Sequence, residues 1–241
     1  MVKFLLIVTL LASPSVFAGY LAEFERVNKS NGEVEKVSFQ AFGRNSVLLR
    51  EQANGQIYGW LYFDGGDYLV RRNSVEEWRL IGIAGHGAST KSHSKHRVAP
   101  NSKNKISIDL QDTGEVAHLS DYRGNKYEAQ VFVGGELVEK ATLSLSQHQH
   151  ITSLRDDYLA LLEGMSRRSG MSIGEGDAPR EMRYARSISV MARGGVIAYE
   201  GSDYRLQLKS IENGTGPIFL PAAPEFPEAD EIEQLALNFY R

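Results

Sequence analysis

From Tyr20 onward, hydrophobic and polar residues alternate in short segments that end at glycine or asparagine turns. In YLAEFE, the first segment, aromatic or small residues occupy every second position, and Glu23 and Glu25 fall between them. This period of two is typical of an antiparallel strand with one buried face. The pairs Asn31-Gly32 and Asn54-Gly55 favour tight hairpins, because both turn residues tolerate positive φ. The pattern therefore predicts neighbouring strands joined by hairpins, with a meander as the simplest topology.

About ten strands are expected from this pattern, some of them closely spaced. Strand-like segments, twelve in all, lie at residues 20–25, 36–41, 47–52, 57–63, 68–72, 106–110, 115–119, 127–133, 136–145, 184–192, 196–200 and 204–211. Gly, Ser, Lys, His and Asn dominate residues 82–105, which are predicted to form a long loop. The glycine-rich stretch 170–179 is predicted to be a connection, and four prolines break regular structure between Pro217 and Pro227.

The segment from His150 to Arg168 changes to the helical period. Its apolar residues recur every three or four positions, which predicts one principal helix with an apolar stripe. Thr152 or Ser153 is suited to cap its start. The predicted fold class is α+β, mainly β. We expect a single strongly curved antiparallel sheet, a half-barrel, with this helix packed on its concave face.

A gap between sheet and helix is the natural place for a ligand. In the strand 57–63, Tyr58, Trp60 and Tyr62 share one face while Ile57, Leu61 and Phe63 share the other, so both faces require a cover. The second cover is either the helix or a bound hydrophobic ligand. The residues predicted to line the cavity are Phe39, Trp60, Tyr62, Leu154, Tyr158 and Leu161.

Residues 1–18 combine Lys3, an apolar run and small residues before Ala18, which is typical of a cleavable secretory signal peptide. A membrane anchor is the alternative, but the apolar run is shorter than the roughly 20 residues that cross a bilayer. We expect cleavage after Ala18, periplasmic localisation, a folded domain over residues 19–227 and a short helical tail at 228–241. Cleavage changes the net charge from −3 to about −4, which does not favour nucleic acid as a partner.

The sequence contains no cysteine, so disulfides, thiolate metal sites and cysteine nucleophiles are excluded. His93 and His96 lie in the loop 85–104, where no Asp or Glu occurs between Glu77 and Asp109. A catalytic zinc usually needs three protein ligands, so a solvated loop is favoured over a metal site. His148 and His150 face the same test, and one of them is predicted to cap or pack at the start of the helix.

No serine-nucleophile motif of the form G-x-S-x-G is present, and adjacent acids such as Asp156-Asp157 point apart. The sequence therefore predicts no catalytic residue, no metal and no cofactor, and the protein is not expected to be an enzyme. A hydrolase built from residues distant in sequence is the weakest alternative.

Several segments carry a resemblance that spans nearly the whole chain after Ala18. They are YLAEFERV, SVLLREQ, QIYGWLYFDGGDYLVRR, TGEVAHLSDYRGNKYEAQVF, the helix ITSLRDDYLALLEGM and the closing IFLPA. Their order resembles the LolA- and LolB-like periplasmic lipoprotein carriers, and more closely the DUF4412-type family of unknown function. The resemblance implies a half-barrel whose apolar cavity shields acyl chains. The long helix that such carriers place before the first strand is missing here.

The function expected from these observations is non-enzymatic binding of a hydrophobic or amphipathic ligand, such as an acyl chain or a lipoprotein, between sheet and helix in the periplasm. The alternative is an envelope protein–protein interaction or sensing module without a small ligand. Such a module would use a sheet edge or the loop 85–104. Neither hypothesis involves nucleic acid or a transmembrane segment.

Overall fold

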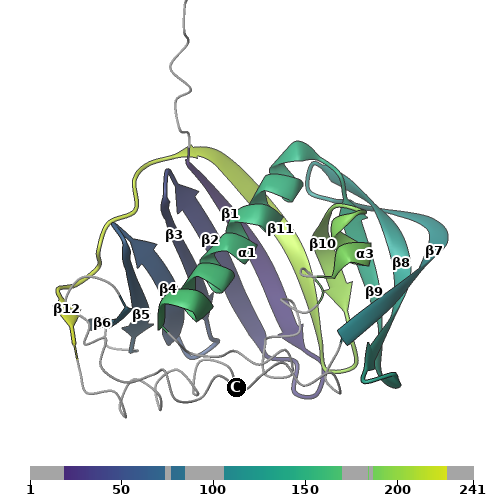
Figure 1. Cartoon of the computed structure of the whole chain (residues 1–241), viewed down its shortest axis with the longest axis horizontal. Helices are drawn as coiled ribbons and strands as arrows, with labels where there is room; N and C mark the ends of the chain where they lie inside the picture. Colours follow the sequence, from purple (N-terminus) through teal and green to yellow (C-terminus); the bar gives the residue numbers. More distant parts are fainter. Residues whose placement is uncertain (1–18, 74–76, 85–105, 170–183, 185–186, 227–241) are drawn as a thin grey trace, which may run out of the picture.

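The computed structural model describes residues 19–73, 77–84, 106–169, 184 and 187–226. Within these residues the chain forms one open twelve-stranded sheet and two helices (Figure 1). The predicted signal peptide, the histidine-containing loop 85–104, the glycine-rich connection and the C-terminal helical tail lie outside the described residues. None of the described helices is both long enough and apolar enough to cross a membrane.

Two antiparallel meanders make up most of the sheet. The first consists of β1 (Gly19–Asn28), β2 (Val34–Phe42), β3 (Asn45–Glu51), β4 (Ile57–Phe63), β5 (Gly66–Arg72) and β6 (Trp78–Ala84). The second consists of β7 (Ile106–Leu119), β8 (Tyr122–Val133), β9 (Glu136–Ser146), β10 (Gly195–Glu200) and β11 (Tyr204–Thr215). Antiparallel pairing of β1 with β11 joins the two meanders into one sheet. The two-residue strand β12 (Pro224–Glu225) adds to β6 in parallel.

The turn chemistry read from the sequence is confirmed at the Asn31-Gly32 and Asn54-Gly55 hairpins, and a third hairpin, at Gly134-Gly135, follows the same rule. Gly32, Gly55 and Gly135 have φ angles of 74°, 80° and 92°, in the left-handed region that favours glycine. They lie in the turns that join β1 to β2, β3 to β4 and β8 to β9. The meander prediction is therefore correct for these pairs, and it holds because the turns fix which residues face each other.

The predicted strand at 184–192 is wrong. Tyr184 is helical, and residues 188–191 form the short helix α3 (Ile188–Met191). The alternating pattern there is overridden by tertiary packing: the turn buries Tyr184 and Val190 in a hydrophobic cluster with β7 to β11 and leaves Ile188 exposed.

The strand boundaries differ from prediction at two further places. β6 was not among the predicted strands, and its residues 82–84 were predicted to open the long loop. Gly82 is a packing position, since a Cβ there would lie 2.3 Å from the Phe226 ring. The predicted strands 106–110 and 115–119 are one strand, β7, whose register shifts between Asp112 and Val116.

The helix α1 (Gln149–Ser169) agrees with the predicted range to within one residue at each end. It crosses one face of the sheet from β10 toward β5 and β6 (Figure 1). We call this face the helix face. Its buried cluster combines apolar residues of the helix and of the strands: Ala22, Phe39, Ala41, Leu48, Trp60, Leu69, Ile81, Ile83, Tyr122, Ile151, Leu154, Leu161, Leu162, Ile197 and Leu208.

The opposite face of β3 to β6, here called the back face, has a cluster of its own. Leu61, Tyr68, Val70 and Leu80 pack there against Ile218, together with partly buried Leu220 and Ala222. The segment that follows β11 therefore covers this face. The sequence left open whether the helix or a ligand covers the second side of β4; a proline-rich segment of the chain itself does.

Candidate functional site

A pocket of about 130 Å³ lies between α1 and the helix face of the sheet. Most of its lining is apolar. The apolar and aromatic lining residues are Phe24, Val37, Phe39, Leu48, Leu143, Ile151, Leu154, Tyr158, Leu162, Tyr184, Val196, Tyr199 and Leu206. Arginine side chains from β1, β3 and α1 complete the wall. An apolar cavity of about 150 Å³ is enough for a benzene-sized molecule, so this pocket has room for one segment of a hydrophobic ligand.

Three of the six predicted lining residues border this pocket: Phe39, Leu154 and Tyr158. Trp60 and Leu161 lie in the same hydrophobic cluster, 1% and 3% exposed, as packed core. Tyr62 is partly buried against that cluster. The pocket lies over β3, β2, β1, β11, β10 and β9, whereas Trp60 and Tyr62 belong to β4, on the far side of β3.

Aromatic side chains bind the helix to the sheet beside the pocket. The Phe39 and Tyr158 rings meet edge to face with centroids 5.8 Å apart, and Tyr20 lies 6.2 Å from Phe39. The Tyr20 hydroxyl donates a hydrogen bond of 2.8 Å to Asp157 Oδ2 on α1. Burial raises the pKa of Tyr20, and the Asp157 carboxylate raises it further. Tyr20 therefore stays neutral and keeps its donor proton at physiological pH.

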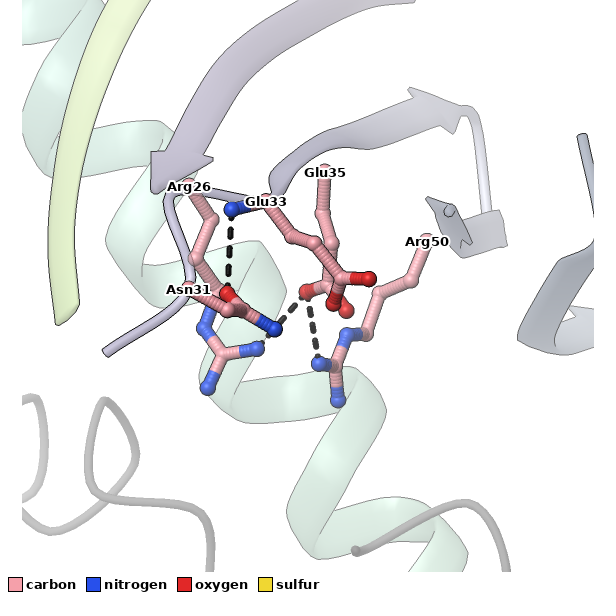
Figure 2. Close-up of polar contacts among 5 residues, drawn as sticks. All are labelled: Arg26, Asn31, Glu33, Glu35 and Arg50. Carbon is pink, nitrogen blue, oxygen red and sulfur yellow. Dashed lines mark hydrogen bonds and ion pairs between the residues drawn. The ribbon is translucent and has the colours of Figure 1, made fainter. Parts of the chain in front are cut away.

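Two arginines of the pocket wall, Arg26 and Arg50, form a row with Glu35 toward the β1–β2 turn. Arg26 Nη1 and Arg50 Nη2 both donate to Glu35 Oε2, over 2.7 Å and 2.8 Å (Figure 2). We call Arg26, Glu35 and Arg50 the charged row. Their side chains are 24%, 18% and 25% exposed, so the row is largely withdrawn from water.

The sheet register creates this row. Arg26 lies directly opposite Glu35 across β1 and β2, and Arg50 lies opposite Val37 across β2 and β3. Arg26 shares a strand face with Phe24, and Arg50 shares one with Leu48, so both guanidiniums are on the side that faces α1. The turn next to the row is ordered by Asn31 Oδ1, which accepts a 3.0 Å hydrogen bond from the Glu33 backbone N–H (Figure 2).

The row carries two positive charges and one negative charge. Burial raises the pKa of Glu35, but Arg50 and then Arg26 outweigh burial and hold the pKa below its usual value. Glu35 is therefore ionised at neutral pH, and the row keeps one net positive charge. Arg26 also lies over the Tyr204 ring, 4.2 Å from its centroid, which holds the guanidinium against β11.

A third arginine reaches the pocket from the helix. Arg155 Nη1 donates to the backbone oxygens of Met191 and Gly194, over 2.9 Å and 3.0 Å, and its Nη2 lies 2.7 Å from Asp156. Arg155 thus ties α1 to the chain that enters β10, and Asp156 balances its charge.

The charged row was missed when the sequence was read alone, although the pattern contained a signal. Continuing the apolar series of β1 past Phe24 leads to Arg26, and continuing that of β2 back from Val37 leads to Glu35. A charge in an apolar series of a strand marks an inward-facing polar side chain. The Asn31-Gly32 hairpin also fixes which residues are opposite, so the Arg26–Glu35 pair follows from the turn.

His148 and His150 belong to the start of the helix. The His148 carbonyl accepts the first helical N–H groups, and its Nδ1 accepts the His150 backbone N–H at 3.2 Å. The prediction that one histidine caps or packs at this end is confirmed, because His148 caps it. The prediction of Thr152 or Ser153 as the cap is wrong, since α1 already begins at Gln149. In the part of the chain that the structure describes, no group of three or more His, Asp or Glu side chains is arranged to hold a metal.

Comparisons with known proteins add little to this geometry. No family model and no curated protein matches the chain. Among solved structures, one similar chain is described as "Structure of PNGF-II in P21 space group", with 9% identity and a TM-score of 0.37. The alignment covers 90% of this chain but 33% of that one, so the chain spans about a third of its length. A TM-score this low supports no conclusion about fold or function.

Proposed function

We propose that this protein binds a hydrophobic or amphipathic ligand between α1 and the sheet, without catalysing a reaction on it. The observation that carries the proposal is the pocket, whose wall is largely apolar and is formed by both the helix and the strands. Burial of apolar surface contributes about 25 cal/mol for each Å² removed from water, so a chain-like apolar ligand gains affinity by entering. Export to the periplasm and kinship with the half-barrel carriers are parts of the same proposal, drawn from the sequence.

We also propose that the sheet is a half-barrel with α1 on its concave side. A helix of 21 residues is about 32 Å long. Seven strand-to-strand spacings separate β10 from β6, and they amount to about 34 Å. The helix contacts β10 at one end, β5 and β6 at the other and β3 between them, and the pocket lies beside it over β3, β2, β1, β11, β10 and β9. A sheet that bends away from a straight helix at its middle strands would leave this space.

The binding test uses the full chain and a fluorescent fatty-acid analogue, with lipid extraction and mass spectrometry of the purified protein as a second readout. The variant Leu154→Trp fills the pocket from the helix and is expected to reduce probe binding at least tenfold, because the indole occupies the ligand's place. Ile188→Trp is the matched control, since Ile188 is 85% exposed on α3 and does not line the pocket. Equal probe binding by the two variants would contradict the proposal.

A further inference from the structure

We propose that the group held in this pocket is a single aromatic ring, so that the ligand is a ring-bearing molecule rather than one with a plain alkyl chain. This inference rests on the proposed binding function and adds the chemical class of the ligand. It starts from two features of the pocket, its volume and the aromatic side chains on two of its sides.

The volume of the pocket limits what it can enclose. At about 130 Å³, the pocket is close in size to the cavity of about 150 Å³ that accommodates benzene, a molecule of six carbon atoms. A chain of twelve carbon atoms needs roughly twice that space, so about half of it would stay outside. A rigid ring also loses less conformational freedom on entry than a flexible chain does. The volume therefore favours one compact ring.

The pocket lies between two hydrophobic clusters. Phe39 belongs to the cluster that α1 shares with the helix face, whereas Tyr184 and Tyr199 belong to the cluster of α3 and β7 to β11. Phe24 and Val37 pack against both clusters and line the pocket. A group bound here would therefore contact both clusters at once.

Each cluster presents a pair of aromatic rings to the pocket. On the side of α1, Phe39 and Tyr158 meet edge to face with centroids 5.8 Å apart. On the other side, the Tyr184 and Tyr199 centroids are 5.3 Å apart, and 58° separates the ring planes. A ligand ring between the two pairs would make aromatic contacts with both, and such contacts add affinity beyond the buried area. An alkyl chain would gain from the buried area alone.

These rings are held in place by the protein itself. The Tyr199 hydroxyl donates a 2.5 Å hydrogen bond to Glu139 Oε1, and the Phe39 and Tyr184 side chains are 1% and 2% exposed. A wall that is already fixed loses little freedom when a ligand enters. The aromatic pairs are therefore preorganised for a ring of matching size.

Binding is measured by isothermal titration of the full chain with three probes that each contain ten carbon atoms and one carboxylate: 4-phenylbutanoate, 4-cyclohexylbutanoate and decanoate. 4-Phenylbutanoate is expected to bind about tenfold more tightly than decanoate, the effect of two aromatic pairs. It should also bind several-fold more tightly than 4-cyclohexylbutanoate, which carries a ring of similar size without π-electrons. Decyl and cyclohexyl groups are the more hydrophobic, so the hydrophobic effect alone would give the opposite order.

One variant removes an aromatic ring from the wall. Phe24→Leu keeps an apolar side chain between the two clusters and should reduce the preference for 4-phenylbutanoate over 4-cyclohexylbutanoate about threefold. Both affinities are measured on the same protein, so partial unfolding lowers them alike and leaves their ratio unchanged. Phe63→Leu is the matched control, because Phe63 is partly buried on the back face and does not line the pocket.

The outcomes separate the two proposals. A preference for 4-phenylbutanoate that Phe24→Leu reduces and Phe63→Leu leaves unchanged supports the ring inference. Decanoate or 4-cyclohexylbutanoate binding as tightly as 4-phenylbutanoate overturns that inference and leaves the apolar pocket as proposed, and so does a preference that Phe24→Leu does not change. Absence of binding by all three probes overturns the proposed function itself.

Discussion

The two faces of strands β3 to β6 are both apolar, yet different kinds of structure cover them. On the back face, Ile218, Leu220 and Ala222 pack from an extended segment that can follow the strands residue by residue. On the helix face, α1 is a straight rod about 10 Å across, which touches the sheet along one stripe. The pocket lies beside this stripe and reaches β3 with Leu48 and Arg50. An extended cover seals a strand face, whereas a helical cover leaves space beside its line of contact.

Truncation of one leucine on each face gives the largest expected contrast. Leu80 is fully buried on the back face, and Leu80→Ala should cost about 4 kcal/mol of unfolding free energy, near the upper end for such changes. Leu154 borders the pocket, so it has fewer neighbours to lose, and Leu154→Ala should cost about 2 kcal/mol. Urea unfolding measures both values. Equal costs would mean that α1 packs on the sheet as tightly as the C-terminal segment does.

A substitution that adds one methyl group at Gly195 tests the contact of α1 with β10. A Cβ on Gly195 would lie 2.6 Å from the Ile151 backbone oxygen, so Gly195→Ala should push the helix away and cost about 2 kcal/mol. Gly216→Ala is the matched control, because a Cβ there meets nothing within 4 Å and its φ is not positive. Thermal unfolding distinguishes the two. A Gly195→Ala protein as stable as the control would show that the helix start moves without cost.

The elements of this fold that the sequence predicts correctly are those that local chemistry determines. The hairpins follow from glycines with positive φ, and α1 follows from a sustained helical period. The end of β6 was mistaken for loop because Gly82 reads as a breaker, while its real partner, Phe226, lies far away in sequence. The helical turn at Ile188–Met191 was mistaken for a strand because burial of Val190 by distant strands decides it. A local pattern of hydrophobic and polar residues does not show contacts with residues that are distant in the sequence.

The same distinction between local patterns and long-range packing applies to the residues of the candidate site. Phe39, Leu154 and Tyr158 were placed toward the helix–sheet interface by periodicity, and they do border the pocket. The charged row needs two further facts, the hairpin register and the location of the pocket over β1 to β3. The first follows from the Asn31-Gly32 turn. The second depends on how the helix lies across the sheet, which no sequence period determines.

The start of α1 offers a smaller perturbation of the helix face alone. His148→Ala removes the side chain that accepts the His150 N–H and should cost about 1 kcal/mol, the usual value of a lost N-cap. His148→Asn, which supplies another capping acceptor, should restore the stability. His118→Ala on exposed β7 is the control. Loss of stability in both alanine variants, or failure of asparagine to restore it, would contradict the capping role.

The pH dependence of the charged row is the smallest expected effect and the one that separates the two faces most cleanly. Burial raises the pKa of Glu35, but Arg50 and Arg26 together lower it by more than burial raises it. The pKa of Glu35 in the folded state therefore lies below its pKa in the unfolded state. The carboxylate therefore contributes stability that is fully present above its usual pKa and is lost as pH falls through the folded-state value. In urea unfolding, the gap between wild type and Glu35→Gln should shrink from pH 6 to pH 3. The gap for Leu80→Ala, which involves no ionisable group, should stay constant. A Glu35→Gln gap that also stays constant would show that the arginines do not favour the ionised form of Glu35.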